Sequence, residues 1–404
     1  MTTEVKSKLA INGGEPVRTE PFPGWPRPTE KMKEQLIHTF ENEAWGIGSK
    51  VVKDFEDAFA NFHDSKFALS VNSGTAALWV ALKAAGVKAG DEVIVPAYTF
   101  VATASAVLMA NAIPVFADID KKTLNMDTEI VESLITDKTR VILPVHIAGN
   151  PADISSLKEI ADKHGVAMIE DAAQAHGAEW EGRKVGSFGL GGIFSFQSSK
   201  NMSAGEGGII VTDHQDFMDR CFSYQNVGRV RNGQWYEHDH LGGNFRLSAF
   251  PASLLLAQIE SLDDDMKLRE RNAEILNREL GKIDGLTLIN RYPKTTRVSH
   301  HLFIFLYNSE KFNHTPREVF IKALSAEGIP AYTGYKPLYR ENLFITNARE
   351  YPWLEGTDFS KLHLPVTEKT CETAIWLKQN CLLGSEEDTM DIVRAVEKVV
   401  EYYS

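Results

Sequence analysis

The chain has 404 residues, of which 43% are hydrophobic, and it carries a formal net charge of -12. This length exceeds the usual limit of a single hydrophobic core, so we expect two domains. The acidic balance disfavours a surface for nucleic acid or anionic membrane, because either would need a basic stripe. Three scattered cysteines are too few for a disulfide framework or a four-ligand zinc site.

The first 28 residues are rich in proline and glycine, and we interpret them as an arm that lies on another surface. A frayed terminus is the alternative. The segment lacks the apolar core of a signal peptide, and no apolar run approaches the roughly 18 residues of a membrane helix. We therefore expect a cytoplasmic protein with free thiols at Cys221, Cys371 and Cys381.

A Ser-Gly-Thr turn joins a short strand pattern at residues 68–71 to a helix-forming run at residues 76–82. Serine at this place caps a helix, and Gly74 and Thr75 then stand at its first turn. The free amide groups and the positive end of the helix dipole make a phosphate site. An ordinary helix cap is the alternative.

Short apolar strands then alternate with helical patterns. We expect strands at residues 92–95, 113–116, 140–145 and 166–169, and helices at residues 99–111, 127–135 and 153–164. This alternation predicts a mostly parallel sheet with helices on both faces. Ligand chemistry should gather at the carboxyl ends of its strands, where Phe100, His146, Asp171 and Ser195 fall. His146 is expected to be a hydrogen-bonded structural residue.

Asp171 and Lys200 are the residues to which we assign chemistry. Asp171 ends an apolar strand, and Lys200 lies in a small polar loop after the apolar run 193–196, with glycines close behind it. One carboxylate and one amine at strand ends suit pyridoxal phosphate, because the amine forms a Schiff base and the carboxylate keeps the ring nitrogen protonated. A surface ion pair is the alternative.

Residues 226–240 form a polar segment. We expect this segment either to cover the mouth of the site or to be a solvated loop. A long helical pattern runs from Ser248 toward Glu279 and predicts a bridge to a smaller α+β domain. That domain shows strands at residues 286–289 and 301–307 and a last helix at residues 385–402.

Six sequence blocks carry a resemblance that covers nearly the whole chain. They are NSGTAAL, GDEVIVPAYTFVAT, PVHIAG, IEDAAQAHG, FSFQSSKNMSAGEGG and GGNFRLSAFPASLLLAQIESLDD. In this order they resemble the DegT/DnrJ/EryC1/StrS family of sugar aminotransferases. The chain is most similar to the branch that holds cyclitol (scyllo-inosose) aminotransferases and 3-amino-5-hydroxybenzoate synthases.

The resemblance implies the aspartate-aminotransferase fold (pyridoxal phosphate fold type I), of class α/β. It implies a seven-stranded, mostly parallel sheet between helices in a large domain, followed by a smaller C-terminal α+β domain. We expect an arm at residues 1–28, the large domain at residues 29–262 and the small domain at residues 263–404.

The resemblance also assigns the site. Catalysis falls to Lys200 and Asp171. The residues expected to bind the cofactor are Gly74 and Thr75 (phosphate), Phe100 (ring face), Asp171 (ring nitrogen), Gln174 (ring hydroxyl), Ser195 (phosphate), Lys200 (Schiff base) and Asn244 (phosphate of the partner subunit). Asn244 implies a homodimer with shared active sites. The tyrosine-rich segment with Tyr332, Tyr335, Lys336, Tyr339 and Arg340 is expected to line the substrate pocket.

The activity that follows is the transfer of an amino group from L-glutamine or L-glutamate to a keto-cyclitol or keto-sugar, by ping-pong half reactions in antibiotic or polysaccharide biosynthesis. No spacing in the sequence chooses the donor. An aminodehydroshikimate-aromatising activity of the hydroxybenzoate-synthase type is one alternative. A non-catalytic regulatory or ligand-binding protein is another. Lys200 does not exclude the hydroxybenzoate-synthase type, which keeps the lysine, but it argues against the family members that dehydrate keto-deoxysugar precursors, which carry histidine in its place.

Overall fold

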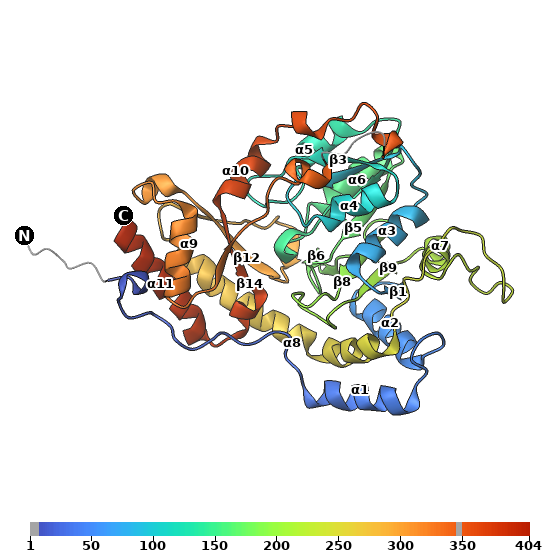
Figure 1. Ribbon diagram of the computed structural model, residues 1–404, viewed down its shortest axis with the longest axis horizontal. Coiled ribbons are helices and arrows are strands. Elements are labelled where there is room, and N and C mark those ends of the chain that lie inside the picture. The colour runs from blue at the N-terminus through green and yellow to red at the C-terminus, as the bar shows by residue number, and fades with distance from the viewer. Residues whose placement is uncertain (1–7, 345–349) are drawn as a thin grey trace, which may run out of the picture.

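The structure of the protein is a computed structural model, and it describes residues 8–344 and 350–404. A large unit forms around a seven-stranded sheet, and a smaller unit forms around a four-stranded sheet. The long helix α8 (Ala249–Leu280) runs from one unit to the other (Figure 1), as the pattern from Ser248 predicts. The first seven residues of the expected arm lie outside the described residues.

The large sheet has the strand order β1-β9-β8-β5-β4-β2-β3. Strand β9 is antiparallel to both of its neighbours, and the other adjacent pairs are parallel. The strands are β1 (Phe67–Val71), β2 (Glu92–Pro96), β3 (Ile113–Ala117), β4 (Thr139–Ile142), β5 (Ala167–Asp171), β8 (Gly191–Ser195) and β9 (Gly208–Thr212). The predicted α/β class with a seven-stranded, mostly parallel sheet is confirmed.

Helices cover both faces of this sheet, so its central strands are buried on both sides. Ile193 of β8 faces the core beneath α3, α4 and α7, whereas its neighbour Phe194 faces the core beneath α2, α6 and α8. The helices are α2 (Lys50–Phe62), α3 (Gly74–Ala84), α4 (Ala102–Met109), α5 (Thr128–Val131), α6 (Ile154–His164) and α7 (Gln215–Gln225). In the described residues, none of the helices is long and apolar enough to cross a bilayer.

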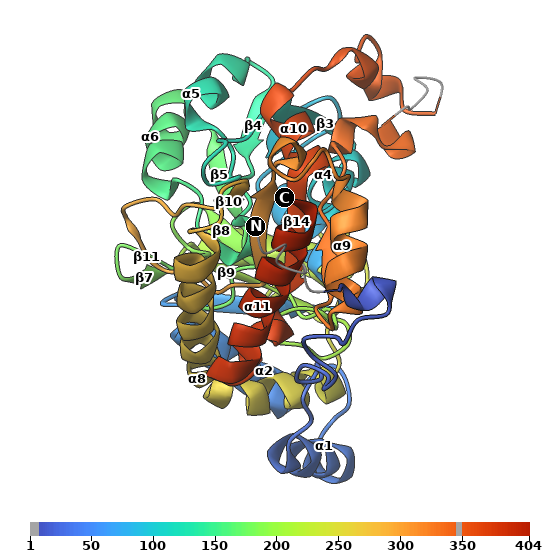
Figure 2. The same cartoon turned by 90° about the vertical axis from the view of Figure 1, so that its left-hand side faces the viewer.

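The small unit is an antiparallel sheet of order β10-β12-β14-β13. Its strands are β10 (Leu286–Leu288), β12 (Leu302–Tyr307), β13 (Ala331–Thr333) and β14 (Ala374–Lys378), with helices α9 (Arg317–Ala326), α10 (Pro365–Thr373) and α11 (Glu386–Tyr403). Figure 2 shows α9 and α11 side by side on the outer face of this unit. The short strands β6 (Glu179–Trp180), β7 (Arg183–Lys184) and β11 (Thr295–Arg297) form a third sheet.

Short 3-10 helices complete the chain. They are η1 (Ala10–Asn12), η2 (Glu132–Leu134), η3 (Ile147–Gly149), η4 (Ser309–Lys311), η5 (Leu338–Arg340), η6 (Asn342–Phe344), η7 (Pro352–Leu354), η8 (Phe359–Lys361) and η9 (Gln379–Leu383). Three of these short helices contact the large unit, where Tyr339, Phe344 and Phe359 pack around Phe116 of β3. Residues numbered after 262 therefore contribute to both cores, and the domain boundaries stay a prediction.

The described part of the N-terminal arm lies along the small unit. Leu9 is buried in the core of that unit, and Arg18 forms ion pairs of 2.6 and 2.9 Å with Asp388 and Asp391 of α11. The arm ends beside the site, where the indole of Trp25 donates a hydrogen bond to the backbone oxygen of Lys200 (2.8 Å). Helix α1 (Glu30–Asn42) follows and packs along α8 (Figure 2).

Candidate active site

A cavity of about 560 Å³ lies at the carboxyl ends of the large sheet's strands, where the small unit closes it with β13 and β14. All the expected cofactor residues except Asn244 line this one cavity, namely Gly74, Thr75, Phe100, Asp171, Gln174, Ser195 and Lys200. The polar segment 226–240 does not line it. That segment extends beyond α7 (Figure 1) with Trp235 and Tyr236 exposed, as a solvated loop would be.

Lys200 sits in the tight turn that follows β8. Its backbone amide donates to the carbonyl of Gln197 (2.9 Å), and its own carbonyl accepts from Trp25, so the turn is fixed on both sides. Burial lowers the pKa of the Lys200 amine to about 8, and the carboxylate of Asp171 partly opposes this shift. A useful fraction of the amine is therefore neutral, and nucleophilic, near neutral pH.

Asp171 is the last residue of β5, and it is 4% exposed. Its carboxylate accepts hydrogen bonds from Thr103 Oγ1 (2.8 Å) and from the amide of Ala173 (3.2 Å). Burial raises the pKa of Asp171, while these two donors and Lys200 oppose the rise. A further cation inside the cavity would stabilise the ionised carboxylate.

The amino end of α3 opens into the same cavity. Ser73 caps the helix, because its Oγ accepts from the amide of Ala76 (3.1 Å). The amides of Gly74 and Thr75, as the first of the helix, have no acceptor inside it. A Cβ at Gly74 would lie 2.7 Å from Cβ of Ser195, so glycine is needed for α3 to approach the end of β8. Gly74, Thr75 and Ser195 thus form a small pocket suited to an anion.

Phe100 and Gln174 also line the cavity. Phe100 is 53% exposed, so it is not a core residue, and it offers an aromatic face to whatever fills the cavity. Gln174 is held at both ends of its amide: Oε1 accepts from the amide of Ala148 (2.8 Å), and Nε2 donates to the hydroxyl of Tyr335 (3.1 Å).

The small unit supplies an aromatic wall made by Tyr332, Tyr335 and Trp376, with Lys378 at its side. The Lys378 amine lies 4.3 Å from the centre of the Tyr332 ring, and it has no carboxylate partner in the described part of the chain.

The expectation that the whole tyrosine-rich segment lines this pocket is wrong for three of its members. Tyr339 is buried in the core of the large unit, and Arg340 pairs with Glu368 (2.6 Å). Lys336 does not line the cavity either. Only the first part of the segment reaches the site because the chain leaves it for the large unit at η5.

His146 is structural, as expected. It is fully buried, and its Nδ1 accepts from the amide of Ala152 (3.0 Å), so Nε2 carries the proton and donates to Glu170 (3.0 Å). The amides of Gly186, Phe188 and Gly189 also donate to that carboxylate.

These residues form an amine, a carboxylate and an anion pocket inside one cavity, and the comparison with protein families agrees with them. The model of the DegT/DnrJ/EryC1/StrS aminotransferase family matches residues 27–397. The chain belongs to this family. It is therefore a member of an aminotransferase family, and it has pyridoxal phosphate fold type I.

Relatives within the family are similar over nearly their full length. An L-glutamine:2-deoxy-scyllo-inosose aminotransferase of Micromonospora echinospora is 37% identical over 412 residues, covering 97% of each chain. The protein of the same name from Streptoalloteichus tenebrarius is 36% identical over 421 residues and covers 98% of each.

Two solved structures of the same fold are also similar. A 3-amino-5-hydroxybenzoic acid synthase aligns with a TM-score of 0.85 at 32% identity, over 95% of this chain and 99% of its own. An aminotransferase of Psychrobacter cryohalolentis aligns with a TM-score of 0.86 at 30% identity, over 95% of this chain and all of its own.

The residues present fit the cofactor of this family. Lys200 has a lowered pKa, Asp171 is a buried carboxylate that would gain from a neighbouring cation, and glycine keeps the α3 pocket open. Asn244 is exposed and lies elsewhere, in a surface depression that also contains Ile47 and Arg246.

The sequence did not reveal three contacts that shape the site. Thr103 binds Asp171, Trp25 binds the Lys200 turn, and Trp376 of β14 donates to Tyr98 (3.1 Å) behind the aromatic wall. Their partners are 68, 175 and 278 positions away in the chain, and local patterns carry no signal of such distant pairs.

Proposed function

We propose that this protein is a pyridoxal phosphate-dependent aminotransferase that moves the amino group of L-glutamine to the ketone of a cyclitol. The observation that carries the proposal is the shared cavity: the Lys200 amine, the Asp171 carboxylate and the amino end of α3 all face it. The names of the relatives support L-glutamine as the donor and a keto-cyclitol as the acceptor.

Each cofactor contact is part of this proposal. When bound, pyridoxal phosphate supplies an aldehyde that captures the amine and a ring that accepts electrons. Lys200 would hold the aldehyde and Asp171 the protonated ring nitrogen. Gly74, Thr75 and Ser195 would bind the phosphate, Phe100 would cover a ring face and Gln174 would meet the ring hydroxyl.

Lys200 would also act as the base that takes the proton from the α-carbon of the amino donor. When it is not bonded to the cofactor, its side chain would lie in the cavity as a free amine, and burial lowers the pKa of this amine to about 8. A base with a pKa near the working pH both accepts and returns a proton readily. The hydrogen bond from Trp25 to the Lys200 carbonyl keeps the backbone of this base in place.

The small-unit wall would recognise the two substrates. Lys378 is a cation with no carboxylate partner in residues 8–344 and 350–404, so it suits the carboxylate of the amino donor. The rings of Tyr332, Tyr335 and Trp376 give the acceptor an apolar floor with hydroxyl and indole groups at its edge. A hydroxylated six-membered ring needs both features.

The active unit in this proposal is a homodimer. Phe40, Trp45 and Ile47 are 59%, 52% and 68% exposed, and Ile47 shares its surface depression with Asn244. An apolar surface of this kind beside a polar residue with no role in its own chain's cavity suits a second copy. Asn244 would then complete the partner's phosphate pocket.

A mixed dimer tests the shared site. Subunits with Asn244→Ala and subunits with Lys200→Ala should each be impaired alone, and mixing them should restore activity in the one intact site of the heterodimer. Absence of recovery in a verified heterodimer would show that the site is not shared.

The function itself is tested by adding L-glutamine to the cofactor-loaded enzyme and following the visible absorbance of the cofactor. The band should disappear with L-glutamine and return with the correct ketone, in a screen of free keto-cyclitols against nucleotide-linked keto-sugars. Lys200→Ala should show neither step, whereas the exposed Lys88→Ala should behave as wild type. No response to L-glutamine or L-glutamate would overturn the proposal.

We also propose a cytoplasmic location. Its support is that Cys221, Cys371 and Cys381 are free and buried, which suits a reducing compartment.

A further inference from the structure

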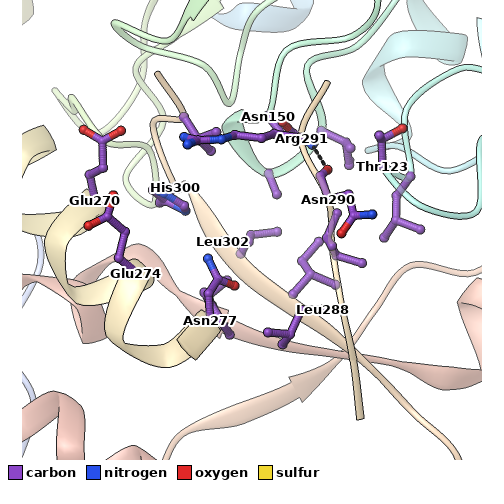
Figure 3. Close-up of a pocket in the computed structure, with 17 residues that line it drawn as sticks. Thr123, Asn150, Glu270, Glu274, Asn277, Leu288, Asn290, Arg291, His300 and Leu302 are labelled. Atoms are coloured by element: carbon purple, nitrogen blue, oxygen red, sulfur yellow. Dashed lines mark hydrogen bonds between the residues drawn. The ribbon is translucent and has the colours of Figure 1, made fainter. Parts of the chain in front are cut away.

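One wall of the active-site cavity carries a histidine beside the residues already assigned. His301 directly precedes β12 and is 7% exposed, and it lines the cavity together with Lys200 and Lys378. Its neighbour His300 lines a different cavity, of about 400 Å³ (Figure 3). The two adjacent histidines therefore border separate spaces, and of the two it is His301 that can meet a substrate of the proposed reaction.

Hydrogen bonds fix which nitrogen of His301 carries the proton. Asn201, the residue after Lys200, is 2% exposed, and its Nδ2 donates to the carbonyl of Ser299 (2.7 Å). Its Oδ1 therefore lies against Nδ1 of His301, at 3.2 Å. Because an amide oxygen can only accept, Nδ1 carries the proton, and Nε2 of a neutral ring is a bare acceptor.

This acceptor is open to the cavity. Nε2 of His301 has no hydrogen-bond partner in the part of the chain that the structure describes, and, unlike the two ring nitrogens of His176, it is not sealed in the interior. Burial lowers the pKa of His301 well below its ordinary value, and the neighbouring Lys200, His176 and Arg269 act in the same direction. The ring is therefore neutral near neutral pH.

The charges around the cavity suit an amino donor with a single carboxylate. Among the described residues, the charged side chains that line it are those of Asp171, Lys200, Glu206 and Lys378. In the proposed function Asp171 and Lys200 hold the cofactor, and Lys378 binds the α-carboxylate of the donor. A second carboxylate, as in glutamate, would find no further cation on these walls, and the lone pair of Nε2 would repel it. The side-chain amide of glutamine offers N–H groups instead.

Strand pairing places His301 near Lys378. Lys378 of β14 pairs with Leu302 of β12, which follows His301, and all three residues line the cavity. Cross-strand neighbours have Cβ atoms about 5 Å apart. The α-carboxylate and the side-chain amide of glutamine are separated by four bonds, which span a similar distance. One glutamine molecule can therefore meet both residues.

We propose that His301 gives this enzyme a preference for L-glutamine over L-glutamate, because its Nε2 accepts a hydrogen bond from the side-chain amide of the donor while Lys378 binds the α-carboxylate. This inference rests on the proposed function, since it names the residue that selects the donor of that reaction.

The test is the rate of the first half reaction with three donors. Cofactor-loaded enzyme is mixed with L-glutamine, L-glutamate or the γ-methyl ester of L-glutamate, and the loss of the visible absorbance of the cofactor is followed. The side chain of the ester is neutral like that of glutamine, but it has no N–H group. Wild type should react with L-glutamine at least about tenfold faster than with either of the others, because both leave Nε2 unpaired.

Variants assign this preference to one ring. His301→Phe removes the acceptor, so the rate with L-glutamine should fall at least about tenfold, and the rate with the ester less than about threefold. His301→Gln offers an amide oxygen in place of Nε2 and should keep most of the preference. His300→Asn is the control in the other cavity and should behave as wild type, since asparagine tolerates the left-handed backbone at this position (φ 49°).

Three results would overturn the inference. Wild type could use L-glutamate or the ester as fast as L-glutamine, and this comparison decides even where a variant does not fold. His301→Phe could slow L-glutamine and the ester by the same factor, or it could slow only the second half reaction, with the ketone. In each case the enzyme still transfers amino groups, so the proposed function stands. A wild type that responds to none of the three donors would overturn both.

Discussion

The active-site cavity has two walls of different origin. The wall at the edge of the large sheet carries an amine in the turn after β8, a carboxylate at the end of β5 and the amino end of α3, which follows β1. The opposite wall, from β13, the residues that follow it and β14, carries three aromatic rings and Lys378, which has no carboxylate partner among the described residues. In the proposed function, the first wall would hold the groups that every transamination needs, and the second wall would hold those that meet a particular substrate.

In the proposed function, the first wall would therefore determine the rate of the reaction, and the second wall would determine which acceptor is preferred. Changes in the sheet-edge wall should lower the rate with every acceptor alike, because in the proposed function these residues hold the cofactor. Changes in the small-unit wall should alter the ranking of acceptors and spare the cofactor.

The largest effect is expected for Asp171→Asn. The amide keeps the size of the side chain and can still accept from Thr103, but it carries no charge for a protonated ring nitrogen. We expect kcat to fall by about 10²- to 10³-fold with every acceptor. Steady-state kinetics with two ketones measure it. A rate near that of wild type would remove Asp171 from the mechanism.

The pH dependence of cofactor capture should follow Lys200. A protonated amine cannot attack an aldehyde, and burial lowers the pKa of Lys200 from 10.5 to about 8. Capture of pyridoxal phosphate by the apoenzyme should therefore rise about tenfold per pH unit below about pH 8 and level off above it. Stopped-flow absorbance records the rate. A rate that keeps rising toward pH 10 would mean that the reacting amine is exposed.

Thr103→Val should give a smaller effect of the same kind. It removes the hydroxyl that donates to Asp171, so the pKa of the carboxyl should rise further and kcat should fall about tenfold, or about 1.4 kcal/mol. Thr103→Ser is the control because it keeps the donor. Should valine and serine behave alike, packing rather than the hydrogen bond is responsible.

Tyr335→Phe should have the smallest effect and a different signature. Its hydroxyl accepts from Gln174 and faces the cavity, so its loss should raise KM for a hydroxylated ketone about fivefold with little change in kcat. Kinetics with ketones of different hydroxyl pattern measure the selectivity. An equal loss for all acceptors would break the division between the two walls.

The sheet-edge wall was predictable and the other wall largely was not. Asp171, Ser195 and Phe100 follow apolar strand patterns, and parallel strands bring their carboxyl ends to one edge whatever the details of packing. Trp376 and Lys378 belong to β14, a strand that the sequence analysis did not assign, and they reach the cavity through pairing with β12 and β13. Strand β9, whose direction opposes its neighbours, was likewise missed.

Local chemistry was predictable where distant contacts were not. The Ser-Gly-Thr turn caps α3 as expected because the cap lies within four residues. The packing of Tyr339 and Phe359 on the large unit depends on Phe116, more than 200 positions earlier, and no local pattern encodes it.

The account rests on Lys200 as the residue that holds the cofactor. The direct measurement is borohydride reduction of the cofactor-loaded enzyme, which fixes the cofactor to its lysine, followed by peptide mass mapping. We expect the added mass on the peptide that contains Lys200. The same mass on a peptide with another lysine, and none on that of Lys200, would contradict it.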